Sequence, residues 1–226
     1  MTIHSNLHTW PGFLILAGKY DIMPPQNTRL ERSFFVREDV IRVSRELLGK
    51  YLVTNLGEGL TAGRIVEVEA YRAPEDKASH AYGNRLTERT RVMFSRGGHA
   101  YIYLCYGIHH LFNVVTGGEG MAHAVLIRAL EPAENLNLML RRRRMDKVAA
   151  RLTAGPGVLS QAMGITRELT GTDMLHPESP IWIESREKPI AATDILCSPR
   201  IGVDYAEECA AWEWRFFLKG NPWVSK

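Results

Sequence analysis

Long apolar runs are missing from this sequence, and no segment approaches the ~20 consecutive apolar residues that a helix needs to cross a bilayer. The short apolar stretch 13–17 follows no basic region, so we expect no secretory signal. Cysteine is also scarce, since Cys105, Cys197 and Cys209 are an odd number without CxxC spacing. These absences argue against membrane association, disulfides and a cysteine-based metal site, and they predict a cytoplasmic protein with reduced thiols.

The remaining composition is that of an ordinary globular protein. The chain has 226 residues, of which 45% are hydrophobic and 23% charged, so it can bury a sizeable core. Its formal net charge of +3 is mildly basic, which is compatible with a polyanionic partner but does not require one.

The beginning of the chain differs from the rest. Residues 1–30 contain several prolines and no sustained hydrophobic period, so we expect a poorly ordered extension. Residues 31–226 show neither an internal repeat nor a further boundary, and we expect them to form a single domain.

Strands predominate in the expected order of elements, especially in the first half. Val40, Val43 and Leu47 recur at helical spacing, and Gly49 ends that helix. Further helices are expected at 133–151 and after 155–157, short helices within the polar loop 74–96, and strands at 51–53, 63–71, 99–116 (a hairpin), 123–130, 181–184, 200–204 and 214–218. Because regular strand–helix alternation is absent, this order predicts an α+β fold with a mostly antiparallel curved sheet, surrounding helices and a protruding hairpin.

Polar and apolar residues alternate along the strand at 63–71, a period typical of a half-buried strand. Glu67, Glu69 and Tyr71 therefore share one face. Three side chains that form hydrogen bonds, converging beside a core, predict the floor of a pocket.

The hairpin at 99–116 alternates in the same way and carries an aromatic residue at its turn. Tyr101 and Tyr103 precede the pair Tyr106-Gly107, which marks the tip. A carboxylate on a strand near an aromatic tip suits an enzyme that opens a stacked polymer and performs chemistry on one unit.

Glu69 is the leading catalytic candidate because of its neighbours. A lone strand carboxylate is usually solvent-facing, but Tyr71, His80, Asn113 and Arg128 follow in the sequence. One glutamate among aromatic rings and a histidine fits general base catalysis on a flat ring. Metal binding fits poorly because the His and Glu residues lack ligand spacing, and no lysine on these strands offers a nucleophile.

A basic run at Arg141–Arg144 leaves two interpretations open. On a helix it covers several faces, so it is either a solvated face or a patch that contacts phosphates. Gly155 and Gly157 open the next helix, whose free backbone N–H groups could face a phosphate, although Gly-Pro is usually only a turn.

Two motifs carry a resemblance to a known family: EAYRAPEDKASHA at 69–81 and YIYLCYGIHHLFN at 101–113. Matching stretches occur in order from about Ser33 to Ser225 and include RTRVMF, VLIRALEP, GPGVLSQAMGI, PRIGVDYA and GNPWVS. With these motifs the sequence resembles the alkyladenine (3-methyladenine) DNA glycosylase family. Residues 1–30 lie outside the resemblance.

The resemblance implies roles for individual residues. The water-activating glutamate corresponds to Glu69, and the arginine that orients the water corresponds to Arg128. Tyr106 corresponds to the intercalating residue, with Ile108 as a second wedge. The base-binding residues are Tyr71, His80, Tyr103 and Asn113, and the candidate contacts to the DNA backbone are Arg141, Arg142, Gly155 and Gly157. The sequence departs from the family where Val158 replaces a frequent Lys and Glu213 a frequent Pro.

The implied function is a monofunctional DNA repair glycosylase that needs neither metal nor cofactor. Such an enzyme flips an alkylated or deaminated purine out of duplex DNA and hydrolyses its N-glycosidic bond. Cation–π attraction to the tyrosine walls is expected to favour a cationic base by roughly 0.5–2 kcal/mol. The expected partner is double-stranded DNA containing damaged purines, bound by a monomer associated with a bacterial-type nucleoid.

Two other functions are compatible with part of this pattern. A non-catalytic module that binds damaged nucleic acid would use the same basic character and aromatic tip, but a buried carboxylate would cost it affinity. A hydrolase of free nucleosides would have no use for the hairpin wedge or the basic run.

Overall fold

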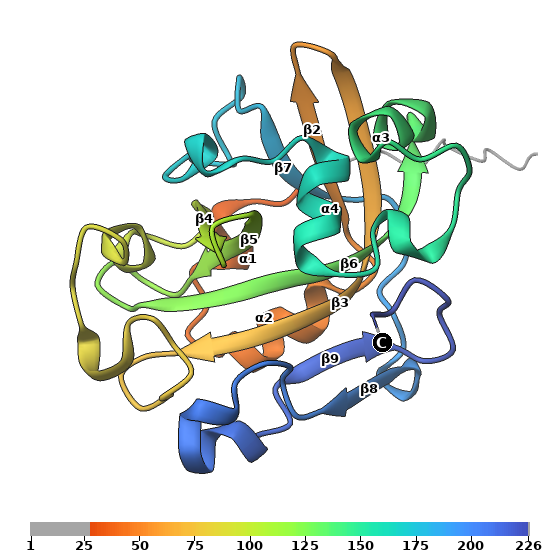
Figure 1. Cartoon of the computed structure of the whole chain (residues 1–226). Coiled ribbons are helices and arrows are strands. Elements are labelled where there is room, and N and C mark those ends of the chain that lie inside the picture. Colours follow the sequence, from red (N-terminus) through yellow and green to blue (C-terminus); the bar gives the residue numbers. More distant parts are fainter. Residues whose placement is uncertain (1–27, 226) are drawn as a thin grey trace, which may run out of the picture.

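Two long antiparallel strands, β3 (Gly59–Arg72) and β6 (His123–Glu134), cross the centre of the structure, a computed structural model that describes residues 28–225 (Figure 1). Register shifts between Ile65 and Val68 interrupt their ladder, and such irregularities bend a strand. Both strands belong to a nine-stranded sheet whose pairings are antiparallel throughout the described chain. The predicted α+β class with a mostly antiparallel, curved sheet is confirmed.

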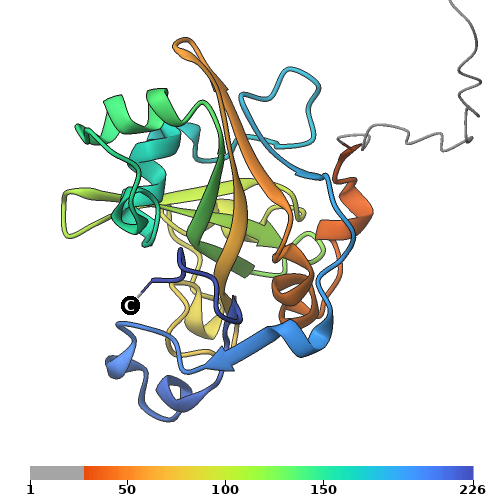
Figure 2. The same ribbon diagram turned by 90° about the vertical axis from the view of Figure 1, so that its right-hand side faces the viewer.

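The strand order is β1-β7-β2-β3-β6-β5-β4, and β9 pairs with both β3 and β8. The bounds of the remaining strands are β1 Thr28–Arg29, β2 Tyr51–Leu56, β4 Ala100–Cys105, β5 His109–Thr116, β7 Ile181–Ser185, β8 Ile195–Ser198 and β9 Arg215–Leu218. The hairpin predicted at 99–116 is β4 and β5, and its tip projects on the same side of the sheet as α3 and α4 (Figure 2).

Helices cover both faces of the sheet. The α-helices are α1 Arg32–Phe35, α2 Val40–Leu47, α3 Leu136–Arg143 and α4 Pro156–Met163, and the 3-10 helices are η1 Tyr82–Asn84, η2 Arg91–Phe94, η3 Ala150–Leu152, η4 Arg167–Leu169, η5 Ala192–Asp194 and η6 Asp204–Ala211. The orange-red helices α1 and α2 lie on one side, and the green and teal helices α3 and α4 on the other (Figure 2). The main core between them includes Leu47, Ile65, Phe112, Ile127 and Leu159.

The sequence explains where α2 and α4 begin and end. The Asp39 side chain accepts a hydrogen bond from the backbone N–H of Arg42 at 2.9 Å, which caps α2. In α4, Pro156 occupies the first turn and Gly164 ends the helix in the left-handed conformation with a φ of +72°. Both helices were predicted at these places.

Two sequence predictions were wrong in extent or position. The helix expected at 133–151 ends at Arg143, because Arg144 adopts a left-handed φ of +51°. No strand forms at 200–204, because polar groups there contact the β3 region: Arg200 binds Asp76, and the Ile201 N–H binds a side chain of β3. The strand β8 lies earlier, at Ile195–Ser198.

The predicted N-terminal extension lies almost entirely outside the described residues, and the proposed boundary near residue 30 stays a prediction. Thr28 and Arg29 pair with Ser185 and Glu184 of β7. Across residues 28–225, none of the helices has the length and apolar character needed to cross a membrane.

Candidate active site

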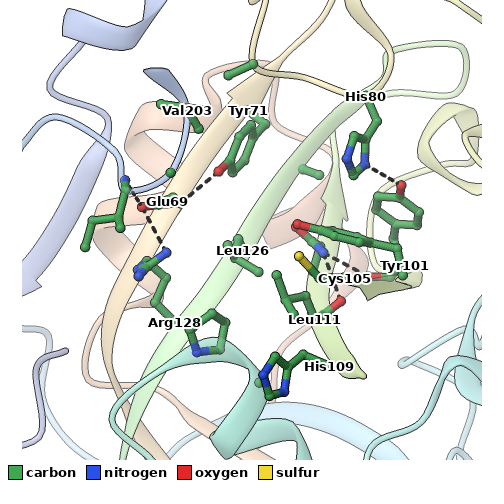
Figure 3. Close-up of a pocket in the computed structure, with 18 of the residues that line it drawn as sticks. Glu69, Tyr71, His80, Tyr101, Cys105, His109, Leu111, Leu126, Arg128 and Val203 are labelled. Atoms are coloured by element: carbon green, nitrogen blue, oxygen red, sulfur yellow. Dashed lines mark hydrogen bonds and ion pairs between the residues drawn. The ribbon is translucent and has the colours of Figure 1, made fainter. Parts of the chain in front are cut away.

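A pocket of about 690 Å³ opens beside the centre of β3 (Figure 3). It lies between β3, β6, the β4–β5 hairpin, the start of α4 and the segment 201–205. The predicted site residues that line it are Glu69, Tyr71, His80, Tyr103, Tyr106, Asn113, Arg128, Gly155 and Gly157. Glu69, Tyr71 and Arg128 lie on one side of the pocket, and His80 and Tyr101 on the other (Figure 3). The fold thus brings together residues that are up to 88 positions apart (Glu69 to Gly157).

The exposed fraction of Glu69 is 0%, yet the residue borders the pocket. Its Oε1 accepts a hydrogen bond from the Ile201 backbone N–H at 2.8 Å and lies 3.2 Å from Arg128 Nη1. Its Oε2 accepts a hydrogen bond from the Tyr71 hydroxyl at 2.8 Å. Four lone pairs on a carboxylate exceed these three contacts, so Glu69 can still accept a hydrogen bond from a water in the pocket.

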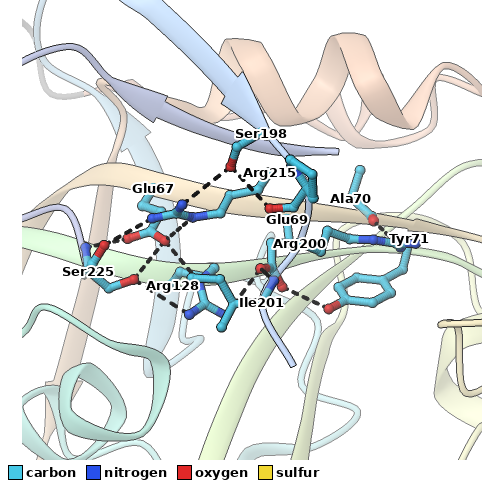
Figure 4. A network of polar contacts seen from close by, with 11 residues as sticks. Glu67, Glu69, Ala70, Tyr71, Arg128, Ser198, Arg200, Ile201, Arg215 and Ser225 are labelled. Carbon is cyan, nitrogen blue, oxygen red and sulfur yellow. Dashed lines mark hydrogen bonds and ion pairs between the residues drawn. The ribbon is translucent and has the colours of Figure 1, made fainter. Parts of the chain in front are cut away.

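Arg128 is also held by a second carboxylate, Glu67, which is not among the residues that line the pocket (Figure 4). Arg128 Nε donates to Glu67 Oε1 at 2.9 Å, and Glu67 also accepts from Arg215 Nε at 2.7 Å. The backbone N–H of Ser225 donates to Glu67 Oε2 at 2.6 Å. Burial acts to lower the pKa of Arg128, but the charges of Glu69 and Glu67 prevail and raise it. Arg128 therefore stays a fixed cation beside Glu69.

Tyr71 and Tyr103 provide aromatic surface in the pocket and stay protonated. Burial and then the charge of Glu69 raise the pKa of Tyr71 well above its usual value, so its hydroxyl is the donor to Glu69. Burial likewise raises the pKa of Tyr103. The ring of His80 meets that of Tyr103 edge-on, with centroids 4.6 Å apart.

His80 is fixed in one tautomer by two neighbours. Arg89 Nη2 lies 2.9 Å from His80 Nε2, and His80 Nδ1 lies 2.7 Å from the Tyr101 hydroxyl. Since a guanidinium can only donate, Nε2 accepts and Nδ1 carries the proton that is donated to Tyr101. Burial, followed by the charge of Arg89, lowers the pKa of His80 to about 4. The imidazole is therefore neutral at physiological pH.

Asn113 is immobilised at the base of the hairpin. Its side-chain amide nitrogen donates to the carbonyls of Tyr101 at 3.1 Å and Leu111 at 3.2 Å. Both amide hydrogens are thereby used, which leaves the Oδ1 acceptor to the pocket that Asn113 lines.

The tip of the hairpin has the geometry of a projecting wedge. Tyr106 is 90% exposed, and Ile108 is 71% exposed. Tyr106 adopts a left-handed φ of +50°, which turns the chain and carries the ring away from the sheet. Tyr106 borders the mouth of the pocket, whereas Ile108 is not among the residues that line it.

The basic run divides into inward and outward side chains. Arg142 exposes only 8% of its side chain and donates to Glu58 Oε2 at 2.9 Å and to the Ala162 carbonyl at 3.2 Å. Arg141 exposes 68% and approaches Glu58 at only 3.9 Å. At the start of α4, a Cβ atom on Gly157 would come within 2.8 Å of the His109 ring, so this close approach requires glycine.

Several residues that shape the site were missed by sequence reasoning. The guanidinium of Arg200 binds both oxygens of Asp76, at 2.6 and 2.8 Å, and lies 4.8 Å from the Tyr71 ring centroid. The others are Glu67 as a partner of Arg128, Arg89, Ile201, Arg215 and Ser225. Except for Arg215, they lie in stretches that carry the resemblance or on the polar face of the 63–71 strand, which is the signal that could have identified them.

The distribution of possible metal ligands can be described for residues 28–225. Among residues 28–225, no three His, Cys, Asp or Glu side chains lie together as metal ligands would. Glu69, the carboxylate that lines the pocket, is instead paired with Arg128.

Comparison with known proteins identifies similar chains. The family model described as "Methylpurine-DNA glycosylase (MPG)" matches residues 33–222. A Chlamydia felis protein is 48% identical over 190 residues, covering 84% of this chain and 95% of its own. A Chlamydia abortus protein is 49% identical over 190 residues (84% and 97%), and a Bacillus cereus protein 44% identical over 198 residues (85% and 97%). All three are named "Putative 3-methyladenine DNA glycosylase".

Proposed function

The chain belongs to the methylpurine-DNA glycosylase family, and on that premise we propose that it flips alkylated or deaminated purines out of duplex DNA and hydrolyses their N-glycosidic bond. A DNA glycosylase for alkylated bases follows from the family and from the names of its relatives. The flipping step, the purine scope and the residue roles below are the proposal.

The observation that carries the proposal is the placement of Glu69. A fully buried carboxylate borders an open pocket and is oriented by Tyr71, Ile201 and Arg128. Burying a charge in this way is costly unless it is paired, and here the pairing leaves one face of the carboxylate toward the pocket. That arrangement suits a general base for a water molecule.

Access to the glycosidic bond requires the nucleotide to leave the helix. The base in a duplex is stacked and paired, so rotating it out costs a few kcal/mol. Tyr106 projects beside the mouth of the pocket and would fill the vacated stack, as wedge side chains do in other DNA-bending proteins. Ile108, also exposed, would support the wedge.

Inside the pocket, the flipped purine would stack against aromatic walls and meet the water on its sugar side. Tyr71, Tyr103 and His80 provide the walls, and Asn113 limits which purine edge fits. Glu69 would take a proton from the water and balance the charge of an oxocarbenium-like sugar, while Arg128 holds Glu69 and the water in place. Attack from the face opposite the base would form the C1′–O bond as the C1′–N bond breaks, and the bonding electron pair would leave with the purine. The configuration at C1′ would be inverted, and an abasic site would remain.

The pocket supports hydrolysis without a covalent intermediate. Among residues 28–225, no lysine lines it, so this part of the chain offers no amine for a Schiff base there. We therefore propose a monofunctional hydrolase that acts as a monomer on double-stranded DNA, in the cytoplasm and at the nucleoid. Arg141, Gly155 and Gly157 remain the proposed contacts to the DNA backbone. Arg142, whose side chain is 8% exposed and bonded to Glu58 and the Ala162 carbonyl, is proposed to hold this segment in place instead.

One assay separates this function from a non-catalytic module that binds damaged nucleic acid. Filter binding of lesion-containing duplex, undamaged duplex and free nucleoside is measured together with release of the base. The proposal expects preferential binding of the lesion duplex and base release from it alone. Binding of the lesion duplex without base release would support the binding module, and release from the free nucleoside would support a nucleosidase.

A further inference from the structure

Arg89 places a positive charge without a carboxylate partner beside the pocket. Its Nη2 lies 2.9 Å from His80 Nε2, and its guanidinium carbon lies 5.1 Å from the Tyr103 ring centroid. Within residues 28–225, no Asp or Glu lies within ion-pair distance of Arg89. The other arginines near the pocket differ, because Arg128 is bound to Glu67 and Glu69 and Arg200 to Asp76.

The surroundings of Arg89 do not offset its charge. A second cavity of about 370 Å³ adjoins the pocket and shares His80, Arg89 and Tyr205 with it. Lys77 and Arg85 also line this cavity, and no acidic residue of the described range 28–225 does. Lys77 is paired with Glu207 and Glu208, whereas Arg85 and Arg89 form no ion pair with any of the residues that the structure describes. His80 adds no charge, since its Nε2 accepts from Arg89.

Both tyrosine walls already contact a guanidinium. Arg89 lies against Tyr103, and Arg200 lies 4.8 Å from the centroid of Tyr71. The ring quadrupoles that would attract a cationic base are thus engaged by permanent protein cations. Because Glu69 and Arg128 offset each other, Arg89 determines the sign of the net charge on the pocket wall.

We propose that Arg89 biases base selection toward neutral purine lesions and against cationic N-alkylated purines. The proposal rests on the proposed glycosylase function and opposes the simple expectation that aromatic walls favour a cationic base. Hypoxanthine is a neutral lesion, whereas 7-methylguanine carries a positive charge on its imidazole ring. A fixed cation within about one base width disfavours only the cationic 7-methylguanine. In a partly hydrated pocket, we expect it to change the ratio of the kcat/KM values for the two bases by about three- to tenfold.

A competition assay tests this charge dependence. Two labelled duplexes of different length, one with hypoxanthine and one with 7-methylguanine in the same sequence context, are mixed at a mildly acidic pH that keeps 7-methylguanine cationic. The relative rates of base release give the ratio of the two kcat/KM values. The enzymes compared are the wild type, Arg89→Gln, which removes the charge, and Arg89→Lys, which keeps it. Arg89 is exposed, so both variants are expected to fold.

The proposal expects Arg89→Gln to lower the hypoxanthine to 7-methylguanine ratio by about three- to tenfold, and Arg89→Lys to stay within about twofold of the wild type. Any contact of Arg89 with a DNA phosphate affects both duplexes equally and cancels in the ratio. An unchanged ratio in Arg89→Gln, or an equal change in both variants, overturns this proposal. The proposed glycosylase function still stands in that case if the wild type releases either base. A wild-type protein that releases neither base overturns the proposed function as well.

Discussion

Glu67 and Glu69, neighbours on one face of β3, both contact the guanidinium of Arg128 (Figure 4). Glu67 is not among the residues that line the pocket, and it accepts hydrogen bonds from Arg128, Arg215 and both the backbone N–H and hydroxyl of Ser225. Glu69 borders the pocket instead. Of the two carboxylates paired with Arg128, only Glu69 lines the pocket.

The substitution Glu67→Gln is expected to destabilise the fold by about 3–5 kcal/mol, because it removes the carboxylate paired with Arg215 and one of the two carboxylates paired with the buried Arg128. Urea unfolding measures the change. Glu75→Gln is the matched control, since the Arg72–Glu75 pair is largely exposed and its loss should cost under about 1 kcal/mol. Equal stability losses in the two variants would show that the Glu67 network does not hold the site.

Tyr106→Ala tests the wedge at the hairpin tip. Binding and excision of a well-paired lesion should weaken by about 1–3 kcal/mol, the range for one base–aromatic stack. The loss should be smaller on a mismatched lesion, which flips at lower cost. The melting temperature should barely change because the ring is 90% exposed. Single-turnover excision in paired and mismatched duplexes gives the comparison, with Tyr106→Phe as a control that keeps the ring. Equal losses in both contexts would assign Tyr106 a role other than the wedge.

Charge reversal at Arg141 and Arg144 tests the basic run. Both side chains are exposed, and if they contact phosphates, the double Glu variant should flatten the log–log salt dependence of DNA binding by about one to two units. Arg142→Gln serves as the contrast, because its buried contacts with Glu58 and Ala162 predict a loss of stability. A salt dependence that stays the same would make the exposed arginines a solvated face.

The pKa of His80 predicts a pH-dependent stability. It is about 4 in the folded protein, against about 6.5 in an unfolded chain. As the pH falls from 6.5 to 4, the unfolded chain binds a proton at His80 that the folded chain does not, so the free energy of unfolding declines in that window. The decline relative to His80→Gln should be about 2 kcal/mol, allowing for partial exposure of the ring. Urea unfolding of both proteins at about pH 7 and about pH 4.5 measures it. Parallel curves would place the pKa of His80 near its ordinary value.

The local pattern of the sequence was sufficient for the elements that carry the site. Alternation placed Glu67, Glu69 and Tyr71 on one strand face, and Tyr106-Gly107 marked the hairpin tip, because these features depend on neighbouring residues alone. The class of the fold followed from the order of strands and helices. Whether each side chain performs its expected role stays a prediction.

The long-range partners could not be read from local pattern. Arg200 reaches Asp76, 124 positions earlier, and Ser225 reaches Glu67, 158 positions earlier, because the C-terminal segment packs back along β3. The segment at 200–204 looked like a strand, yet the Ile201 N–H binds Glu69 instead of a neighbouring strand. Arg144 gave no local sign that it would end α3.

Single-turnover base release by Glu69→Gln tests the central claim most directly. The amide keeps the shape of the carboxylate but cannot accept a proton, so excision should fall by at least ~10²-fold, as expected for loss of a general base. Binding of lesion-containing duplex, measured on the same preparation, should be retained. The substitution leaves the base-binding residues Tyr71, Tyr103 and His80 and the wedge residue Tyr106 unchanged. Excision close to the wild-type rate by Glu69→Gln would contradict the assignment of Glu69 as the group that activates water.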